Sequence, residues 1–152
     1  MDQLIIFSFP DQTKIADAID ALRKFNSDRL YASAIVAKAN DGTISVQQIT
    51  KAGHGGTIVA ALLGALAGLP AGPAATAIMA AAGTIIGAGA DLTIHDHFTE
   101  FASHIAENLA PGGAVIVAEV AEDSAPSLRS TMERAGGTVT RPSPSQQKLE
   151  TA

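Results

Sequence analysis

The sequence contains no cysteine and no tryptophan, and it has a single tyrosine. Without cysteine, the chain forms no disulfides, offers no thiol nucleophile and holds no zinc through thiolates. Its formal net charge is -5, and its lysines and arginines are scattered rather than clustered. Since nucleic acids are recognised by concentrated positive charge, we expect no nucleic-acid partner. The N-terminus has no basic segment followed by an apolar run, so we expect no signal peptide and a cytoplasmic location.

Residues 55–90 form a stretch without a single charged side chain. Thirteen of these residues are alanine, eight are glycine, and ten are isoleucine, leucine, valine or methionine. Each glycine in an exposed helix costs about 1 kcal/mol relative to alanine. We therefore expect so many glycines in helices only where close packing compensates for that cost.

Two prolines divide this stretch into a predicted helical hairpin. Pro70 ends a helix that arrives from the N-terminal side, Gly72 lies in the turn, and Pro73 suits the first turn of a second helix. The predicted arms are residues 57–69 and 73–90. Glycines recur at four-residue spacing in both arms, which places each pair on one helical face where another backbone can approach closely. These pairs are Gly64 with Gly68 in the first arm and Gly83 with Gly87 in the second.

Outside residues 55–90, the apolar pattern predicts a mixture of strands and helices. Apolar or alternating runs predict strands, and apolar residues spaced by three and four predict amphipathic helices. The predicted strands cover residues 4–9, 30–38, 43–50, 114–120 and 138–140, and the predicted helices cover residues 13–25, 97–109 and 124–135. Asn40, Asp41 and Gly42 predict a hairpin turn between the second and third strands.

The order of these elements predicts an α+β fold. Without the insert, the first six elements form a ferredoxin-like β-α-β-β-α-β unit, which an extra helix and strand follow. We predict a single domain over residues 1–141, with the helical hairpin inserted at residues 55–90. Residues 142–152 are rich in proline, serine, glutamine and charge, which predicts a flexible tail.

The histidines between residues 95 and 104 are the only group that resembles a metal site. His97, Glu100 and His104 fall on one face of a predicted helix, at positions i, i+3 and i+7. Imidazole and carboxylate groups bind zinc and other divalent ions, so these three residues are candidate metal ligands. Their spacing matches no established signature. We therefore favour the alternative that these histidines lie at an interface, where their charge changes near neutral pH.

The chain shows no catalytic motif. Residues 51–56 are glycine-rich and precede a helix, but they lack the P-loop order of glycines, lysine and serine or threonine. Residues 87–89 lack the third glycine and the preceding strand of a dinucleotide-binding fingerprint. No serine lies in a nucleophile elbow. We predict that the chain is not an enzyme, and we expect no catalytic residues and no cofactor.

Several segments together resemble a known family. They are the strand at 4–9 with its turn at Asp11, the helix at 18–22, the Gly/Ala insert, and residues 91–98, 109–112, 114–117 and 136–139. With these segments, nearly the whole chain resembles the bacterial domain-of-unknown-function family 1269, which is often described as a predicted membrane protein. The resemblance implies an accessory role in stress and a connection to the membrane. It carries over no catalytic residues.

Three classes of function follow. We favour a structural or interaction protein that assembles through its glycine-zipper-like hairpin into a homo-oligomer larger than a dimer. The first alternative is a protein at the inner face of the cell membrane that inserts the hairpin into the bilayer. At about 1.5 Å per residue the two arms reach about 20 Å and 27 Å, against a hydrocarbon core of about 30 Å. The second alternative is a module that binds a small ligand or a metal through the sheet and the histidines.

Overall fold

The computed structural model describes residues 2–10, 14–25, 28–51, 59, 62, 64–66, 92–140 and 146. Most of the predicted hairpin therefore lies outside the described residues. The elements are β1 (Asp2–Phe9), α1 (Ile15–Lys24), β2 (Leu30–Lys38), β3 (Ile44–Lys51), α4 (Leu92–Asn108), β4 (Ala114–Ala121), the 3-10 helix η3 (Glu122–Ser124), α5 (Ala125–Arg134) and β5 (Thr138–Val139). The strands and helices predicted outside the insert are all present. Most differ by one or two residues at their ends, but α4 begins at Leu92, five residues before the predicted start at His97.

The strands form one sheet in the order β3-β2-β4-β1-β5, and every neighbouring pair is antiparallel. The α+β class is therefore confirmed, whereas the predicted ferredoxin-like arrangement is not. That arrangement places the first and third strands in the centre, but here β4 lies between β1 and β2 and β3 lies at an edge.

The composition of the strands explains this order. All eight residues of β4 are buried, which requires neighbours on both sides and helices on both faces. In β3, by contrast, the consecutive residues Gln47 and Gln48 point to opposite faces and both are exposed. A strand with exposed glutamines on both faces can remain solvated at the edge of a sheet. It cannot do so in the centre of a sheet whose two faces are both covered by helices.

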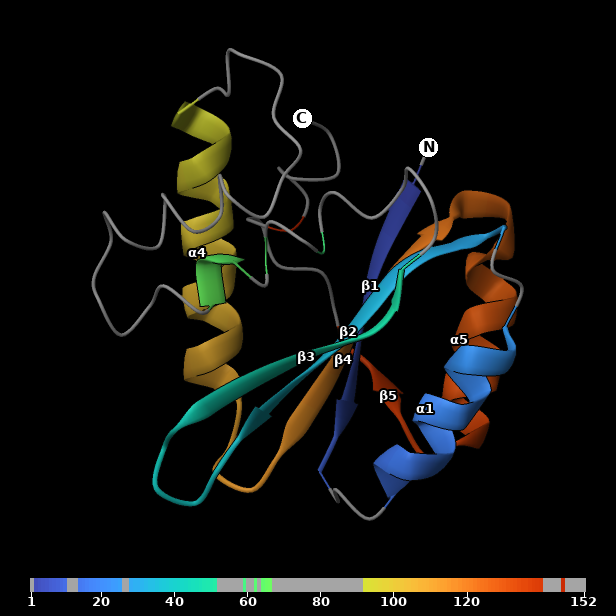
Figure 1. The fold of residues 1–152 in the computed structure, drawn as a ribbon, viewed down its shortest axis with the longest axis horizontal. Helices are drawn as coiled ribbons and strands as arrows, with labels where there is room; N and C mark the ends of the chain where they lie inside the picture. The colour runs from blue at the N-terminus through green and yellow to red at the C-terminus, as the bar shows by residue number, and fades with distance from the viewer. Residues whose placement is uncertain are drawn as a thin grey trace.

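Helices cover both faces of the sheet. Figure 1 shows α4 on one side and α1 and α5 on the other. Alternate residues of β4 serve the two sides: Val115 and Val117 belong to the core cluster that includes residues of α4, while Ile116 and Ala118 belong to the cluster under α1 and α5. We call these two surfaces the α4 face and the α1/α5 face of the sheet.

The predicted turn between β2 and β3 is confirmed. The Gly42 amide donates to the Ala39 carbonyl at 3.0 Å, and Gly42 has a φ of 92°, which glycine adopts without steric cost. The carboxylate of Asp41 accepts a hydrogen bond from the Thr43 amide at 2.9 Å, and this bond lowers the pKa of Asp41 below its usual value.

One residue of the predicted C-terminal tail is described. Gln146 is 2% exposed, and its side-chain amide donates to the Leu4 carbonyl of β1 at 2.8 Å. The Thr140 amide donates to the carbonyl of Ile6, which is also in β1. Since carbonyls alternate between the two edges of a strand, Leu4 is the next residue of β1 whose carbonyl points to this edge, and Gln146 binds it. The other residues of 142–152 lie outside the described part of the chain.

The strand order predicts different costs for substitutions in β4 and β3. Ile116 is fully buried and pairs with Phe7 on one side and Ile35 on the other, so Ile116→Ala should lower the free energy of unfolding by about 2–5 kcal/mol. Gln47→Ala, at the exposed edge, should change it by less than about 0.5 kcal/mol. Urea unfolding of both variants checks this, and similar losses in the two would contradict the observed strand order.

Candidate functional site

The first predicted arm of the insert packs on the sheet of its own chain. Its described residues, at 59, 62 and 64–66, are helical. Val59, Leu62, Ala65 and Leu66 are each at most 2% exposed, and their spacing places them on one helical face. They share a buried cluster with the α4 face of the sheet. We call these four residues the docked stripe.

Gly64 lies on the other side of this helix. With 3.6 residues per turn, Gly64 is rotated by about 200° from Leu62. It is only partly buried, in contrast to the docked stripe. Among the described residues of the arm, Val59, Leu62 and Leu66 therefore lie against the sheet and Gly64 is turned away from it. The other predicted hairpin residues, Gly68, Pro70, Gly72, Pro73, Gly83 and Gly87, lie outside the described residues.

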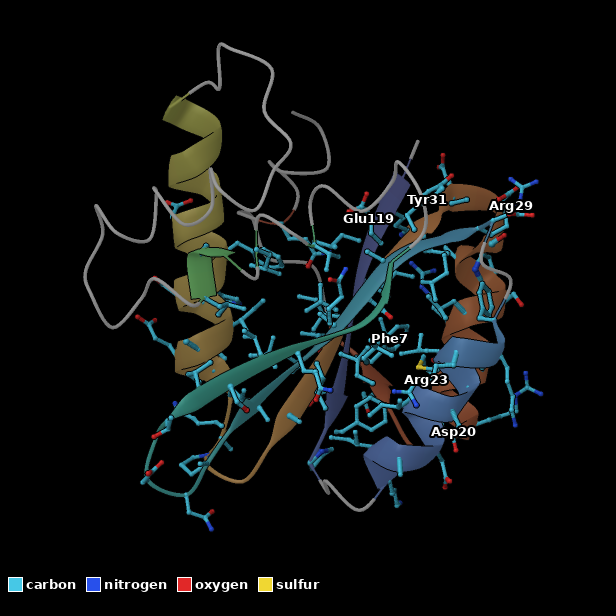
Figure 2. The ribbon with its side chains drawn as sticks, in the orientation of Figure 1. Phe7, Asp20, Arg23, Arg29, Tyr31 and Glu119 are labelled. Carbon is cyan, nitrogen blue, oxygen red and sulfur yellow. The ribbon has the colours of Figure 1, made fainter. Side chains whose placement is uncertain are left out.

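A buried glutamate connects the sheet to this arm. Glu119, in the otherwise apolar strand β4, is 1% exposed, and it lies near the end of β4 (Figure 2). By the alternation of the strand, its side chain points to the same face as Val115 and Val117. Its Oε1 accepts a hydrogen bond from the Val59 amide at 3.2 Å.

Glu119 is not among the residues that the sequence pattern singles out, because residues 114–120 predict one apolar strand. The available signal was a single charged residue flanked by alanine and valine on a strand buried on both faces. Such a residue is rarely buried unless its carboxylate is hydrogen-bonded. The partner itself, an amide 60 residues away, had no signal in the sequence.

The candidate metal ligands all lie on α4. Glu100 and His104 are exposed, and the side chain of His97 lies outside the described part. The Asn108 side-chain nitrogen lies 3.3 Å from His104 Nδ1 and donates to the His104 carbonyl at 2.8 Å. Among the described residues, no three histidines, aspartates or glutamates are grouped as a metal ion would require. The metal hypothesis therefore stays a prediction.

A cavity of about 290 Å³ lies between α4 and the sheet, beside His104. Its wall is mostly apolar, with Ile105 and Leu109 of α4 facing Ile6 and Val115 of the sheet. Its polar groups come from Ser8, His104, Asn108 and Thr140. The volume is at the lower limit for a small-molecule site. A mostly apolar wall with few hydroxyl groups suits the binding of a small apolar molecule better than it suits catalysis.

The membrane hypothesis rests on the insert. No helix within the described ranges is both long enough and apolar enough to cross a bilayer. Most of residues 55–90 lie outside those ranges, so their relation to lipid stays a prediction.

Comparison with known proteins identifies a family for most of the chain. A family model described as a protein of unknown function, DUF1269, matches residues 53–151. The match begins just before the insert and includes α4, β4 and α5. No curated protein and no solved structure matches the chain.

Elemental analysis of protein purified without a histidine tag should find no transition metal near one equivalent per chain. The reason is that the Asn108 side-chain nitrogen already lies 3.3 Å from Nδ1 of the exposed His104 ring. His104→Ala should therefore leave the metal content unchanged, as should Glu107→Ala, a matched change at another exposed position of α4. A stoichiometric metal that is lost in both His97→Ala and His104→Ala would overturn this expectation.

Proposed function

The chain belongs to the DUF1269 family, whose function is unknown, and we propose from its own residues that it is a non-enzymatic interaction protein. In this proposal, the α+β domain displays the Gly/Ala hairpin at residues 55–90, and hairpins of several chains pack together into a homo-oligomer larger than a dimer. The partner is therefore another copy of the same chain.

The observation that carries the proposal is the division of the first arm into two sides. Val59, Leu62 and Leu66 fix one side on the sheet, whereas Gly64 is turned away from the sheet and only partly buried. A helix face that lacks a side chain lets a second backbone approach closely, which favours contact with another helix. A helix that is buried on one side and carries an outward glycine on the other is suited to assembly through helix contacts.

The composition of the insert supports the same conclusion. Residues 55–90 contain no charged side chain. Soluble proteins rarely leave a large uncharged surface in water, and such a surface normally marks an interaction site. Assembly with other copies would cover it.

Shallow insertion of the hairpin into a bilayer is the second candidate function. The same uncharged composition favours it, since a segment without charge avoids the main cost of entering the hydrocarbon region. The two candidates differ in what covers the hairpin, which is protein in the first and lipid in the second.

Light scattering coupled to size exclusion, without detergent, tests the oligomer. We expect a mass above that of a dimer. Gly64→Leu would overpack the glycine face by about 1–3 kcal/mol, and so weaken association by roughly 5- to 150-fold. Ser130→Leu, which adds the same side chain to an exposed position of α5, should not change the mass.

A monomer at every concentration tested would refute assembly through the hairpin. Flotation with phosphatidylcholine vesicles separates the second candidate from the first. A monomeric protein that floats with the vesicles would favour insertion. Equal masses for the native chain, Gly64→Leu and Ser130→Leu would show that the Gly64 face takes no part in assembly.

A further inference from the structure

Glu119 is the one charged residue of β4, and it lies in an otherwise apolar and buried strand. The strand is buried at all eight positions, and the other seven residues are alanine, valine or isoleucine. The positions opposite Glu119 on the flanking strands are Leu4 and Ala32, and both of these are buried and apolar. A carboxylate that loses its water in such surroundings destabilises the fold unless hydrogen bonds replace the water. A leucine would pack here at less cost, so packing does not explain Glu119.

A hydrogen bond between Glu119 and the Val59 amide gives the carboxylate a role at this place. The first arm is predicted to begin at residue 57, so the Val59 amide falls in its first turn, where amides have no acceptor within the helix. The Glu119 carboxylate supplies that acceptor from another element of the fold, at 3.2 Å. Its negative charge also suits the positive end of a helix dipole. The bond joins the most buried strand of the sheet to the start of the insert.

The described residues of the arm make their apolar contacts through the docked stripe. Of the four residues in the docked stripe, Ala65 contributes one methyl group and only Leu62 and Leu66 are large. A short arm rich in alanine could slide or rotate on an apolar sheet at little cost, because apolar contacts have no preferred direction. A charge-assisted hydrogen bond has a preferred direction, and this bond therefore defines the position of Val59 on the sheet.

We propose that Glu119 is a latch for the insert: its carboxylate, rather than apolar packing alone, fixes the first arm on the α4 face of the sheet. Removal of the carboxylate raises the population of the released arm while the sheet stays folded. Glu119 is thus a positioning residue for the insert. This inference concerns contacts within a single chain and goes beyond the proposed oligomer, on which it does not depend.

Release would change the surface of the protein. The docked stripe would leave the buried cluster that it shares with Leu4, Ile6 and Val117. Its four side chains would then lie outside the core, near the start of the charge-free stretch at residues 55–90. The latch therefore decides whether the start of that segment is packed on its own sheet or is exposed.

Hydrogen exchange of the full chain tests the latch with two substitutions. Glu119→Leu removes the acceptor but suits the apolar surroundings, so the sheet should keep its stability or gain some. We expect exchange in residues 59–66 to become about 10- to 100-fold faster, while β2 and β4 exchange as before. Glu119→Gln keeps the shape and a weaker acceptor, so its effect should be roughly 3- to 10-fold.

Glu133→Gln is the matched control, because Glu133 is exposed on α5 and its change should alter nothing in residues 59–66. Unchanged exchange in residues 59–66 of both Glu119 variants would overturn the proposal. So would faster exchange that occurs equally in β2 and β4, because that is general destabilisation. If Glu119→Leu does not fold, Glu119→Gln decides by the same comparison. Light scattering of each sample records its mass, so a failure of assembly is distinguished from a failure of the latch.

Discussion

Burial of β4 on both faces is the constraint on which the rest of the structure depends. Its side chains alternate between the two core clusters, so each face of the strand needs a covering layer. The α1/α5 face is covered by two helices, whereas the α4 face is covered by α4 together with the start of the insert (Figure 1). The insert is therefore part of the core at its base, and not an appendage to a finished domain.

This shared core changes how the Gly/Ala segment is understood. An isolated helix of alanine and glycine has little to hold it in water, since most helix stability in proteins comes from packing of an apolar face. The sheet supplies that packing to Val59, Leu62 and Leu66, and the Glu119 carboxylate gives it a direction. Stability and orientation thus come from different interactions, one apolar and one polar.

The candidate site was only partly predictable from the sequence. The charge-free run and its four-residue glycine spacing predict an interaction segment at residues 55–90, and this stays a prediction. Among the described residues of that segment, Gly64 lies on a helix, on the side turned away from the sheet. The sequence placed His97, Glu100 and His104 together by helical spacing, because that periodicity is local. It could not show that Asn108, one turn beyond His104, engages the imidazole, since many side chains at that spacing do not interact.

The sequence by itself determined the strands and helices outside the insert, the turn at Gly42 and the α+β class, because each follows from patterns within a few residues. Only the tertiary structure decided the strand order, the burial of Glu119 and the contact of Gln146 with Leu4. These features depend on which apolar faces meet. The two hydrogen bonds concerned join residues that are separated by 60 and by 142 positions in the sequence. The pattern of one strand does not by itself specify its neighbours, since several pairings of similar apolar strands bury comparable surface. The polarity of β3 and the burial of β4 on both faces restrict which of these strand pairings can form.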